Sequence, residues 1–351
     1  MKIYFSVDNF LTASNPYART LADGLKKIDD TIESGCGLKN FWNDDIFTYD
    51  IVHIHWPDLL LVPPGRKRTT DELKERLVEI KRKHIKIVST CHNLVPHTNH
   101  NDERMGAYDT VYSNSDTIIH LGSYSLQILL EKYPHIRQIV IPHHVYDQLY
   151  TSIPSKEEAL KFLGLKSNYK YLLCFGKFRS EEERQLVIDV NNRLKSQGFK
   201  MLVPGFSPVD LRRKNPIVLF KSHMQFLLNT IKYPSIIKSY RFVPDSKVPF
   251  YFAAADVCLI PRKHILNSGN LPLSMLMKNV VVGPNMGNVG LLLNETGNPS
   301  FNPESIESVI DAVSRAIVLG EEQGEKNYQW VQKNLLTSYI CDQLLDLYKS
   351  L

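Results

Sequence analysis

Short apolar runs alternate with amphipathic stretches along most of the chain. In the first half the apolar runs read KIYFSV, DIVHIH, IKIVST, TIIHLG and QIVIP, beginning at residues 2, 50, 85, 117 and 138. Between them, the stretches Tyr17–Ile28, Asp71–Lys83 and Tyr124–Lys132 carry apolar residues at helical spacing. This alternation is typical of βα units wound around a parallel sheet. We therefore predict a doubly wound α/β domain in the first half.

The pattern lapses after Pro142 and begins again at Lys170. The second series of apolar runs reads YKYLLCFG, FKMLVPG, IIKSYRF, DVCLIP and VVVG, and the predicted helices among and after these runs are Glu181–Lys195, Pro272–Lys278 and Ser305–Leu319. A last helical segment, Lys326–Leu351, has no strand after it. We predict two Rossmann-like doubly wound domains that face each other across a cleft. They cover residues 1–155 and 156–330, and a helix over 331–351 packs back on the first domain.

Length, charge and cysteine content narrow the class of protein. A chain of 351 residues is long for one hydrophobic core. The net charge of +5 suits an anionic ligand without indicating nucleic acid. Five scattered cysteines predict reduced thiols and a cytoplasmic protein. The N-terminus MKIYFSVDNF is no signal peptide, and no apolar run approaches the ~20 residues of a membrane span, so any membrane contact would be peripheral.

Polar and aromatic residues follow two strands of the first predicted domain. Ligands of doubly wound sheets bind beyond the carboxyl ends of the strands. His55 and Trp56 follow the second apolar run, and His92 follows the third. We expect His53 to be a core residue, whereas His55 is balanced between the core and the ligand site. The histidines at 92, 97 and 100 match no common zinc spacing, so we predict no metal and a hydrogen-bonding role for His92.

A basic segment follows the first strand of the second predicted domain. It contains Gly176, Lys177 and Arg179, with Arg184 in the helix that comes next. A glycine and basic residues before a helix can hold a pyrophosphate through helix amides and guanidinium groups. The alternative is a solvated helix start, in which the acidic run Glu181–Glu183 complements the helix dipole.

The run Asn267, Ser268, Gly269, Asn270, Leu271 precedes another predicted helix. Pro272 suits a first helical position, and the small polar residues before it can present backbone N–H groups to phosphate oxygens. A capped helix without a ligand is the alternative. Gly287 and Gly290 can start a further helix. No G-x-G-x-x-G or Walker A sequence is present, which disfavours a dehydrogenase or a P-loop NTPase.

Seven segments in order carry a resemblance to a known family. They are NPY at 15–17, DIVHIHWP at 50–57, TCHN at 90–93, IPHHVYD at 141–147, FGKFR at 175–179, VPFYFAAADVCLIP at 248–261 and NSGNLPLSMLMKNVVVGPNMG at 267–287. In these segments the chain resembles glycosyltransferases of the GT-B fold, in particular the bacterial members of family four. The resemblance extends over nearly the whole chain.

The resemblance implies a specific reaction. The N-terminal domain would bind the acceptor and the C-terminal domain a nucleotide-sugar such as a UDP- or GDP-hexose, with no metal or other cofactor. The hexose would be transferred, with retention, to a saccharide or lipid-linked saccharide in surface polysaccharide synthesis. If the protein contacts a membrane peripherally, the transfer would take place at the inner face of the plasma membrane.

The resemblance also assigns residues. The catalytic residues would be His92, against the donor sugar, and Arg179, against the pyrophosphate. Donor-binding residues would be Gly176, Lys177, Arg184, Asn267, Ser268, Gly269, Asn270 and Leu271. Residues on the acceptor side would be Asn15, Tyr17, His55 and Trp56.

Two departures from the family pattern keep other functions open. Asn267 and Met275 stand where family members often carry two glutamates. A nucleotide-sugar 2-epimerase, which needs carboxylates near the sugar, is one alternative, and a catalytically inactive nucleotide-sugar-binding module is the other. The basic runs Arg66–Arg68 and Lys81–Lys83 could touch an anionic membrane, although such runs are usually solvated.

Overall fold

The computed structural model describes residues 1–11, 15–96, 101–211 and 215–351. The chain forms two compact units. The first comprises Met1–Tyr146 and Leu335–Leu351, and the second comprises Asp147–Asn334. The divisions therefore fall at residues 146 and 334, compared with the predicted 155 and 330. His97 and His100, weighed above as zinc ligands, lie outside the described residues.

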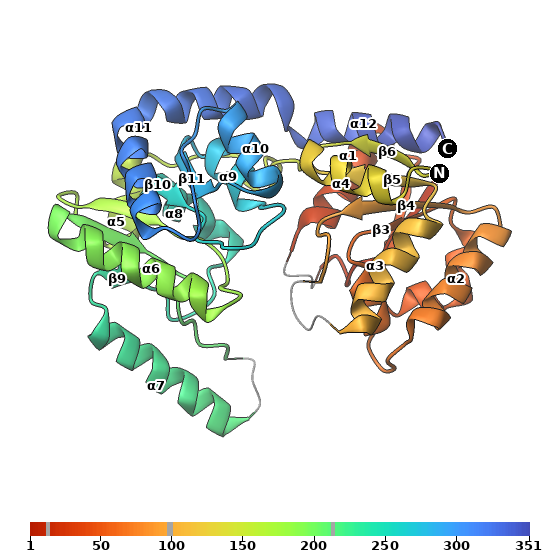
Figure 1. Ribbon diagram of the computed structural model, residues 1–351, viewed down its shortest axis with the longest axis horizontal. Coiled ribbons are helices and arrows are strands. Elements are labelled where there is room, and N and C mark those ends of the chain that lie inside the picture. Colours follow the sequence, from red (N-terminus) through yellow and green to blue (C-terminus); the bar gives the residue numbers. More distant parts are fainter. Residues whose placement is uncertain (12–14, 97–100, 212–214) are drawn as a thin grey trace. The chain divides into compact units, whose positions relative to one another are not determined.

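The first unit is built on a six-stranded parallel sheet with the order β2-β1-β3-β4-β5-β6 (Figure 1). Its central strands are buried on both faces, which is why they appear as continuous apolar runs in the sequence. The strands are β1 (Lys2–Phe5), β2 (Glu33–Cys36), β3 (Ile51–Ile54), β4 (Lys86–Cys91), β5 (Thr117–His120) and β6 (Arg137–Val140). The five predicted strands of this half are confirmed, and the edge strand β2 is an addition.

Helices cover this sheet. They are α1 (Tyr17–Ile28), α2 (Thr70–Arg82), α3 (Asp102–Asn114), α4 (Ser123–Lys132) and α12 (Thr337–Lys349). A capping box defines the start of α2, where Thr69 accepts from the amide of Glu72 and Glu72 accepts from the amide of Thr69. Helix α12 packs against α1 and contributes Ile340 and Leu344 to the core of the first unit.

The second unit is built on another six-stranded parallel sheet, with the order β12-β11-β10-β7-β8-β9. Its strands are β7 (Lys170–Leu173), β8 (Phe199–Leu202), β9 (Ile236–Ile237), β10 (Val257–Leu259), β11 (Val280–Pro284) and β12 (Ser300–Phe301). The surrounding helices are α5 (Lys156–Leu163), α6 (Glu181–Leu194), α7 (Pro216–Lys232), α8 (Val248–Ala253), α9 (Asn270–Leu276), α10 (Gly287–Glu295) and α11 (Ile306–Asn334). Both sheets are doubly wound, as predicted.

The chain end differs from the prediction of one helix over residues 331–351. Helix α11 continues to Asn334, with a kink at Gly320 where φ is +55°. The chain then breaks at Leu335 and Leu336, and α12 begins at Thr337. At the break, Leu336 has a ψ of 142°, outside the helical range, and the carbonyl of Leu335 accepts the amide of Val145 at 2.9 Å.

All five cysteines are free thiols, as predicted. Within the described ranges, every helix falls short of the length and apolar character that crossing a bilayer requires. Short 3₁₀ helices complete the first unit at Asn40–Trp42, Asp44–Thr48 and Pro57–Leu61, and the second at Lys195–Gln197 and Asp245–Lys247.

Candidate active site

The strand order of the first unit locates its binding edge. The chain passes from β1 outward to β2 and then returns to β3 on the other side of β1. Ligands of open α/β sheets bind at such a switch point, outside the carboxyl ends of the two central strands. Ser6 follows β1, and His55 with Trp56 follows β3. The hydroxyl of Ser6 accepts the amide of His55 at 3.1 Å, which fixes the two loop starts to each other.

Four residues predicted from three separate segments meet at this edge. The Nδ1 atom of His55 lies 3.0 Å from Nε2 of His92. The Trp56 indole stacks on the His92 ring with centroids 4.5 Å apart, and Tyr17 meets that ring edge-on at 4.8 Å. The structure thus places His92 in an aromatic cradle, where its ring orientation is fixed by packing as well as by hydrogen bonding.

Burial keeps the histidines of this edge neutral. It lowers the pKa of His53 to about 3 and of His143 to about 4. It also holds the pKa values of His55 and His144 well below the ordinary range, and neighbouring histidines add to that effect. The imidazoles at these positions are therefore uncharged donors and acceptors at neutral pH.

The pairing of His55 with His92 specifies which nitrogen carries the proton. Among the described residues, Nε2 of His55 is buried and has no hydrogen-bond partner. An unpaired buried N–H is rarer than an unpaired buried acceptor. We therefore infer that the proton of His55 lies on Nδ1 and is donated to Nε2 of His92, which assigns the proton of a neutral His92 to Nδ1.

His53 has the core role that the sequence predicted. It is 1% exposed, and both ring nitrogens are bonded: Nδ1 lies 2.6 Å from the hydroxyl of Tyr348 and Nε2 lies 2.7 Å from that of Thr90. Tyr348 belongs to α12, so the returning chain end fixes a histidine beneath the candidate site.

Sequence reasoning assigned no role to His143 and His144, which follow β6. Tyr17 contacts both rings, with centroids 4.8 and 4.7 Å apart, and the hydroxyl of Thr20 bonds Nε2 of His144 at 2.6 Å. The signal was available, because two histidines directly after a predicted strand satisfy the rule that singled out His55 and His92. Tyr17 itself is 3% exposed, so its ring supports the cluster more than it faces solvent.

Asn15 lies at the start of α1. Its side-chain oxygen accepts the amide of Tyr17 at 3.0 Å, which satisfies one of the free N–H groups of the first helical turn. The structure therefore gives Asn15 a capping contact, and the aromatic cluster begins two residues later.

The second unit has its own switch point, between β7 and β10. Gly176 follows β7 with φ of +105°, a conformation that favours glycine. The loop after β8 approaches it so closely that a Cβ on Gly205 would overlap the carbonyl oxygen of Gly176. Two glycines therefore let the two loops touch at this edge.

A buried charge network joins the loops after β7 and β10. Glu183, which is 4% exposed, accepts from a guanidinium nitrogen of Arg262 and from the backbone amide of Arg179, the latter at 2.7 Å. Arg262 also donates to the carbonyl of Lys177 at 2.8 Å. Burial, with the nearby charge of Arg262, lowers the pKa of Arg179 to about 10, so Arg179 remains a cation at neutral pH.

The network was not predicted. Glu183 was read only as part of an acidic helix start, and Arg262 follows β10 without any motif of its own. Its position directly after the apolar run DVCLIP was the available signal.

Two segments predicted to bind the donor are brought together. The side-chain amide of Asn270 donates to the carbonyl of Phe175 at 2.7 Å, so the start of α9 lies against the loop that contains Gly176. Asn267 accepts from Asn288 of α10 at 2.8 Å. Leu271 is 2% exposed, so its side chain belongs to the core and leaves only its backbone for a ligand. Gly287 begins α10 with φ of +59°, which confirms the predicted helix there.

Lys177 and Arg184 line a cavity of about 740 Å³ beyond β7 and β8. The guanidinium of Arg184 lies between the rings of Phe178 and Phe206, 5.3 and 5.2 Å from their centroids, and donates to the carbonyl of Phe206. It also lies 3.3 Å from the carboxylate of Glu181. Arg184 is therefore held in place as part of the cavity wall.

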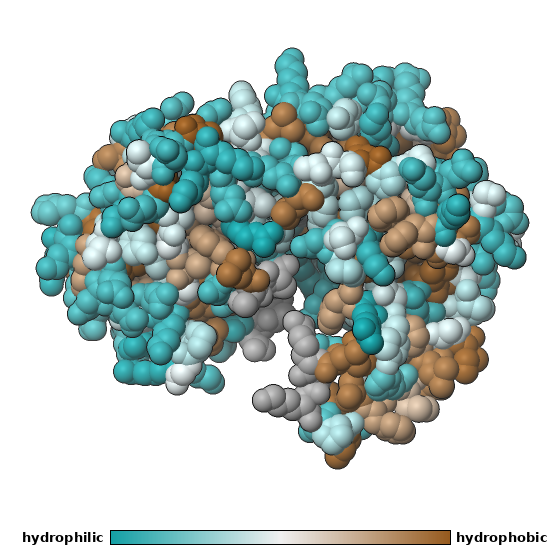
Figure 2. Space-filling model, turned by 180° about the vertical axis from the view of Figure 1, so that it is seen from behind, coloured by the Kyte–Doolittle hydropathy of each residue, from teal (hydrophilic) through white to brown (hydrophobic). Residues whose placement is uncertain are grey.

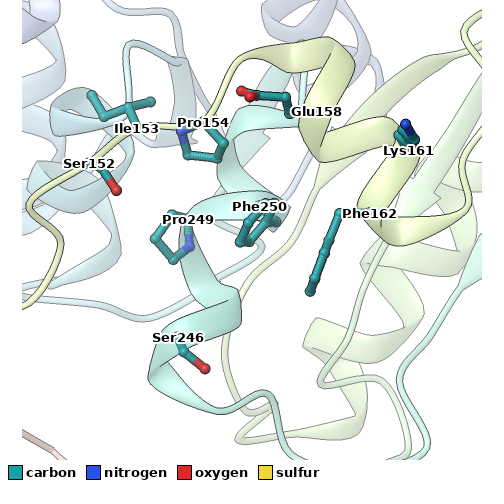
Figure 3. Close-up of a pocket in the computed structure, with 9 residues that line it drawn as sticks. All are labelled: Ser152, Ile153, Pro154, Glu158, Lys161, Phe162, Ser246, Pro249 and Phe250. Atoms are coloured by element: carbon teal, nitrogen blue, oxygen red, sulfur yellow. The ribbon is translucent and has the colours of Figure 1, made fainter.

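A second cavity, of about 800 Å³, lies between α5 and α8 (Figure 3). The rings of Phe162 and Phe250 stack there with centroids 4.0 Å apart. None of the residues predicted for the site lines this cavity. This space therefore lies apart from the residues predicted for the site.

Within the ranges that the structure describes, no group of three or more histidines, cysteines or carboxylates is arranged to hold a metal ion. The two edges offer different chemistry. The first presents neutral imidazoles and aromatic rings, which suit uncharged hydroxyl-bearing ligands. The second presents cationic side chains, glycine-rich loops and backbone amides, which suit an anion.

Comparison with known proteins supports the fold. No protein-family model and no curated protein matches the chain in sequence. Solved structures match over the full length. Sucrose-phosphate synthase from Thermosynechococcus elongatus has a TM-score of 0.76 at 14% identity, with 99% of this chain and 98% of that chain covered. Anabaena HepE in complex with UDP-glucose has a TM-score of 0.72 at 13% identity, with both chains covered completely.

A structure described as a putative UDP-N-acetylglucosamine 2-epimerase from Listeria monocytogenes also matches, with a TM-score of 0.62 at 13% identity and 99% and 96% coverage. These similarities extend over both units of the chain. The chain therefore has the GT-B fold, with two Rossmann-like units.

Proposed function

We propose that this protein is a glycosyltransferase that moves a hexose from a nucleotide diphosphate to a saccharide acceptor. The observation that carries the proposal is the convergence at the edge of the second unit. The loop after β7, which contains Gly176, Lys177 and Arg179, is held to the start of α9 by the bond from the Asn270 amide to the carbonyl of Phe175. The similarity to HepE, which is solved with UDP-glucose, supports the choice of a nucleotide-sugar as ligand.

The second unit would bind the donor. In the proposed reaction the bond between the anomeric carbon and the diphosphate breaks, and the developing charge is stabilised without a metal or other cofactor. Arg179 and Lys177 supply positive charge, and the backbone amides around Asn267 to Leu271 supply hydrogen bonds. The acceptor hydroxyl attacks from the face that the diphosphate leaves, and the departing phosphate oxygen takes the hydroxyl proton. The configuration at the anomeric carbon is retained.

The first unit would bind the acceptor. His92 is proposed to contact the transferred sugar through Nδ1–H, the proton that its pairing with His55 specifies. Trp56, partly exposed and stacked on His92, offers an aromatic face of the kind on which sugar rings pack. The proposed acceptor is a saccharide or lipid-linked saccharide in surface polysaccharide synthesis, assembled in the cytoplasm.

The first experiment is a thermal-shift screen of the purified protein in the presence of EDTA. UDP, GDP and their hexose conjugates are tested against wild type, Arg179→Ala and Arg193→Ala. Arg193 is a matched control, because it is exposed and pairs only with Glu307 among the described residues. A ligand at 100 times its dissociation constant stabilises by about 2.7 kcal/mol. We expect a diphosphate-dependent shift that Arg179→Ala abolishes and Arg193→Ala retains.

The screen also separates the rival functions. No shift with any nucleotide would contradict the proposal. If donor sugars interconvert without an acceptor, the protein is a 2-epimerase, and if donors bind without hydrolysis or transfer across an acceptor panel, it is an inactive binding module. For a transferase, NMR of the product decides the mechanism, because an inverted anomeric centre would rule out the retaining step.

A further inference from the structure

Helix α7 carries a row of exposed apolar side chains. Ile217, Phe220, Leu227 and Ile231 are 65%, 66%, 52% and 72% exposed, and Met224 and Leu228 continue the row. Their spacing of three and four residues places them on one face of the helix. Figure 2 shows apolar side chains gathered over α7, at the lower right of that view. The row therefore forms one continuous apolar surface.

The orientation of α7 is the reverse of that of an ordinary surface helix. Its polar residues Ser222, Gln225 and Asn229 line the 740 Å³ cavity together with Val218 and Lys221, and Asn229 is the buried residue of the helix. Surface helices normally turn the apolar side to the core and the polar side to water. Because an apolar surface of this kind has no role in holding the second unit together, it is typical of a contact with something outside that unit.

The charges around α7 indicate what that contact is. The sequence contains no acidic residue between Asp210 and Asp245. Lys221 lies three residues before Met224, and Lys232 lies four residues after Leu228, so both cations border the apolar row. Neither forms an ion pair with any residue that the structure describes. An apolar face bordered by lysines matches the boundary between acyl chains and anionic headgroups.

We propose that α7 is a membrane-docking helix that lies in the surface of a bilayer containing anionic lipids. The basic runs of the first unit fit this role less well. Arg66 and Arg68 are both paired with Glu72, and Lys81 lies 3.8 Å from Asp116. Their charges are partly neutralised, and no comparable apolar row accompanies them. The proposal goes beyond nucleotide-sugar transfer, since docking on lipid requires neither donor nor acceptor.

The test is sedimentation of the full chain with phosphatidylcholine vesicles that contain phosphatidylglycerol, and with vesicles of phosphatidylcholine alone. Wild type is compared with Phe220→Ser/Ile231→Ser, Lys232→Gln, and two controls. Val318→Ser replaces an 87% exposed apolar residue on α11, and Lys67→Gln/Lys83→Gln removes charges from the first unit's basic runs. All substituted side chains are exposed, so folding should persist, and circular dichroism checks it.

We expect binding to the anionic vesicles. The Phe220 and Ile231 variant should lose at least about tenfold in partitioning, because those side chains would no longer enter the bilayer. Removing the charge of Lys232 should lower partitioning about fivefold, equivalent to about 1 kcal/mol. Both controls should bind like wild type.

Three results would overturn the proposal. They are no vesicle binding by the folded protein, binding lost only in the Lys67 and Lys83 variant, and an α7-dependent dimer in sedimentation equilibrium that the Phe220 and Ile231 variant dissolves. The last would make a second copy the occupant of the surface. Nucleotide-dependent thermal shifts are measured on the same variants, so a failure of lipid docking is distinguished from a failure of the proposed transferase function.

Discussion

The carboxyl edges of the two sheets share a topology but differ in chemistry. Of the 12 histidines, ten precede residue 147 and two, His223 and His264, follow it. The edge of the first unit is built from neutral imidazoles packed against aromatic rings, and the loop after β3 also carries the buried Asp58, 3.6 Å from Arg104. The edge of the second holds a buried Glu183–Arg262 pair beside the cation Arg179. The same βα architecture therefore supports one edge organised around neutral imidazoles and one organised around cations, and the two should respond differently to acid and to substitution.

Acid should separate the two units most strongly. Burial lowers the pKa of His53 to about 3 and that of His143 to about 4, whereas a histidine in the unfolded chain has a pKa of ~6.5. At a pH between the folded and unfolded pKa values, the unfolded chain therefore binds more protons than the folded chain. The first unit therefore has its full stability above pH ~6.5 and loses stability as the pH falls below that point. Each of the two histidines contributes about 1.4 kcal/mol per pH unit, or about 5 kcal/mol together at pH 4.5.

The measurement is urea unfolding from pH 7.5 to 4.5, followed by Trp fluorescence for the first unit and hydrogen exchange for the second. Trp42 and Trp56 lie in the first unit and Trp330 in the second, so Trp330→Phe isolates the signal. If the second unit loses stability first, the contrast between the edges is wrong.

Breaking the charge pair should destabilise the second unit selectively. Glu183→Gln keeps the shape of the side chain but leaves the buried guanidinium of Arg262 without its counter-charge, which typically costs about 3–5 kcal/mol. Glu182→Gln, an exposed change one residue away in the same helix, should alter the free energy of unfolding by less than about 0.5 kcal/mol. Chemical denaturation of both variants measures the change in the free energy of unfolding. Equal changes in the two variants would show that the Glu183–Arg262 pair contributes no more than an exposed carboxylate.

The contact between glycine loops predicts a smaller effect. A Cβ at Gly205 would overlap the carbonyl oxygen of Gly176, so Gly205→Ala must push the loops after β7 and β8 apart. Overpacking of this kind costs about 1–3 kcal/mol. Under the proposed function, nucleotide affinity should fall as well. Gly106→Ala within α3, where the new methyl would meet only the Thr70 side chain, is the control. Unchanged affinity in Gly205→Ala would place the ligand elsewhere.

The smallest expected effect concerns the pairing of His55 with His92. His55→Phe removes the donor to Nε2 of His92, and a neutral hydrogen bond of this kind contributes about 0.5–1.5 kcal/mol. In ¹⁵N spectra the His92 ring should change from a single Nδ1–H tautomer to a mixture. His55→Asn, whose amide can donate from nearly the position of Nδ1, should restore the single tautomer. A wild-type His92 protonated on Nε2 would contradict the assignment.

Sequence patterns predicted the fold best where burial is continuous. Every central strand appeared as an apolar run because both of its faces are covered, and α1 appeared with its bounds because Leu21 and Leu25 repeat at helical spacing. The edge strand β2, with the sequence ESGC, is half-exposed and carries no such pattern. Helix α7 was not predicted either, although its apolar residues Ile217, Phe220, Met224 and Leu227 repeat at helical spacing.

The site was predicted in its parts and not in its connections. The rule of looking after each strand located His55, His92, Gly176 and Arg179, because position along the chain is enough for that step. The Glu183–Arg262 pair joins residues 79 positions apart, and no local pattern links them. Likewise, His53 was assigned to the core, but its bond to Tyr348 depends on a segment that returns from the other end of the sequence.

That return has a consequence for synthesis in the cell. Residues 1–146 can form their sheet as they emerge, but the helix that covers α1 and holds His53 lies beyond residue 334. At about 5–20 residues per second, translation of the intervening segment takes roughly 10 to 40 seconds. During that interval the nascent chain lacks α12, so the surface of α1 that α12 covers in the folded protein stays open until the last helix is made.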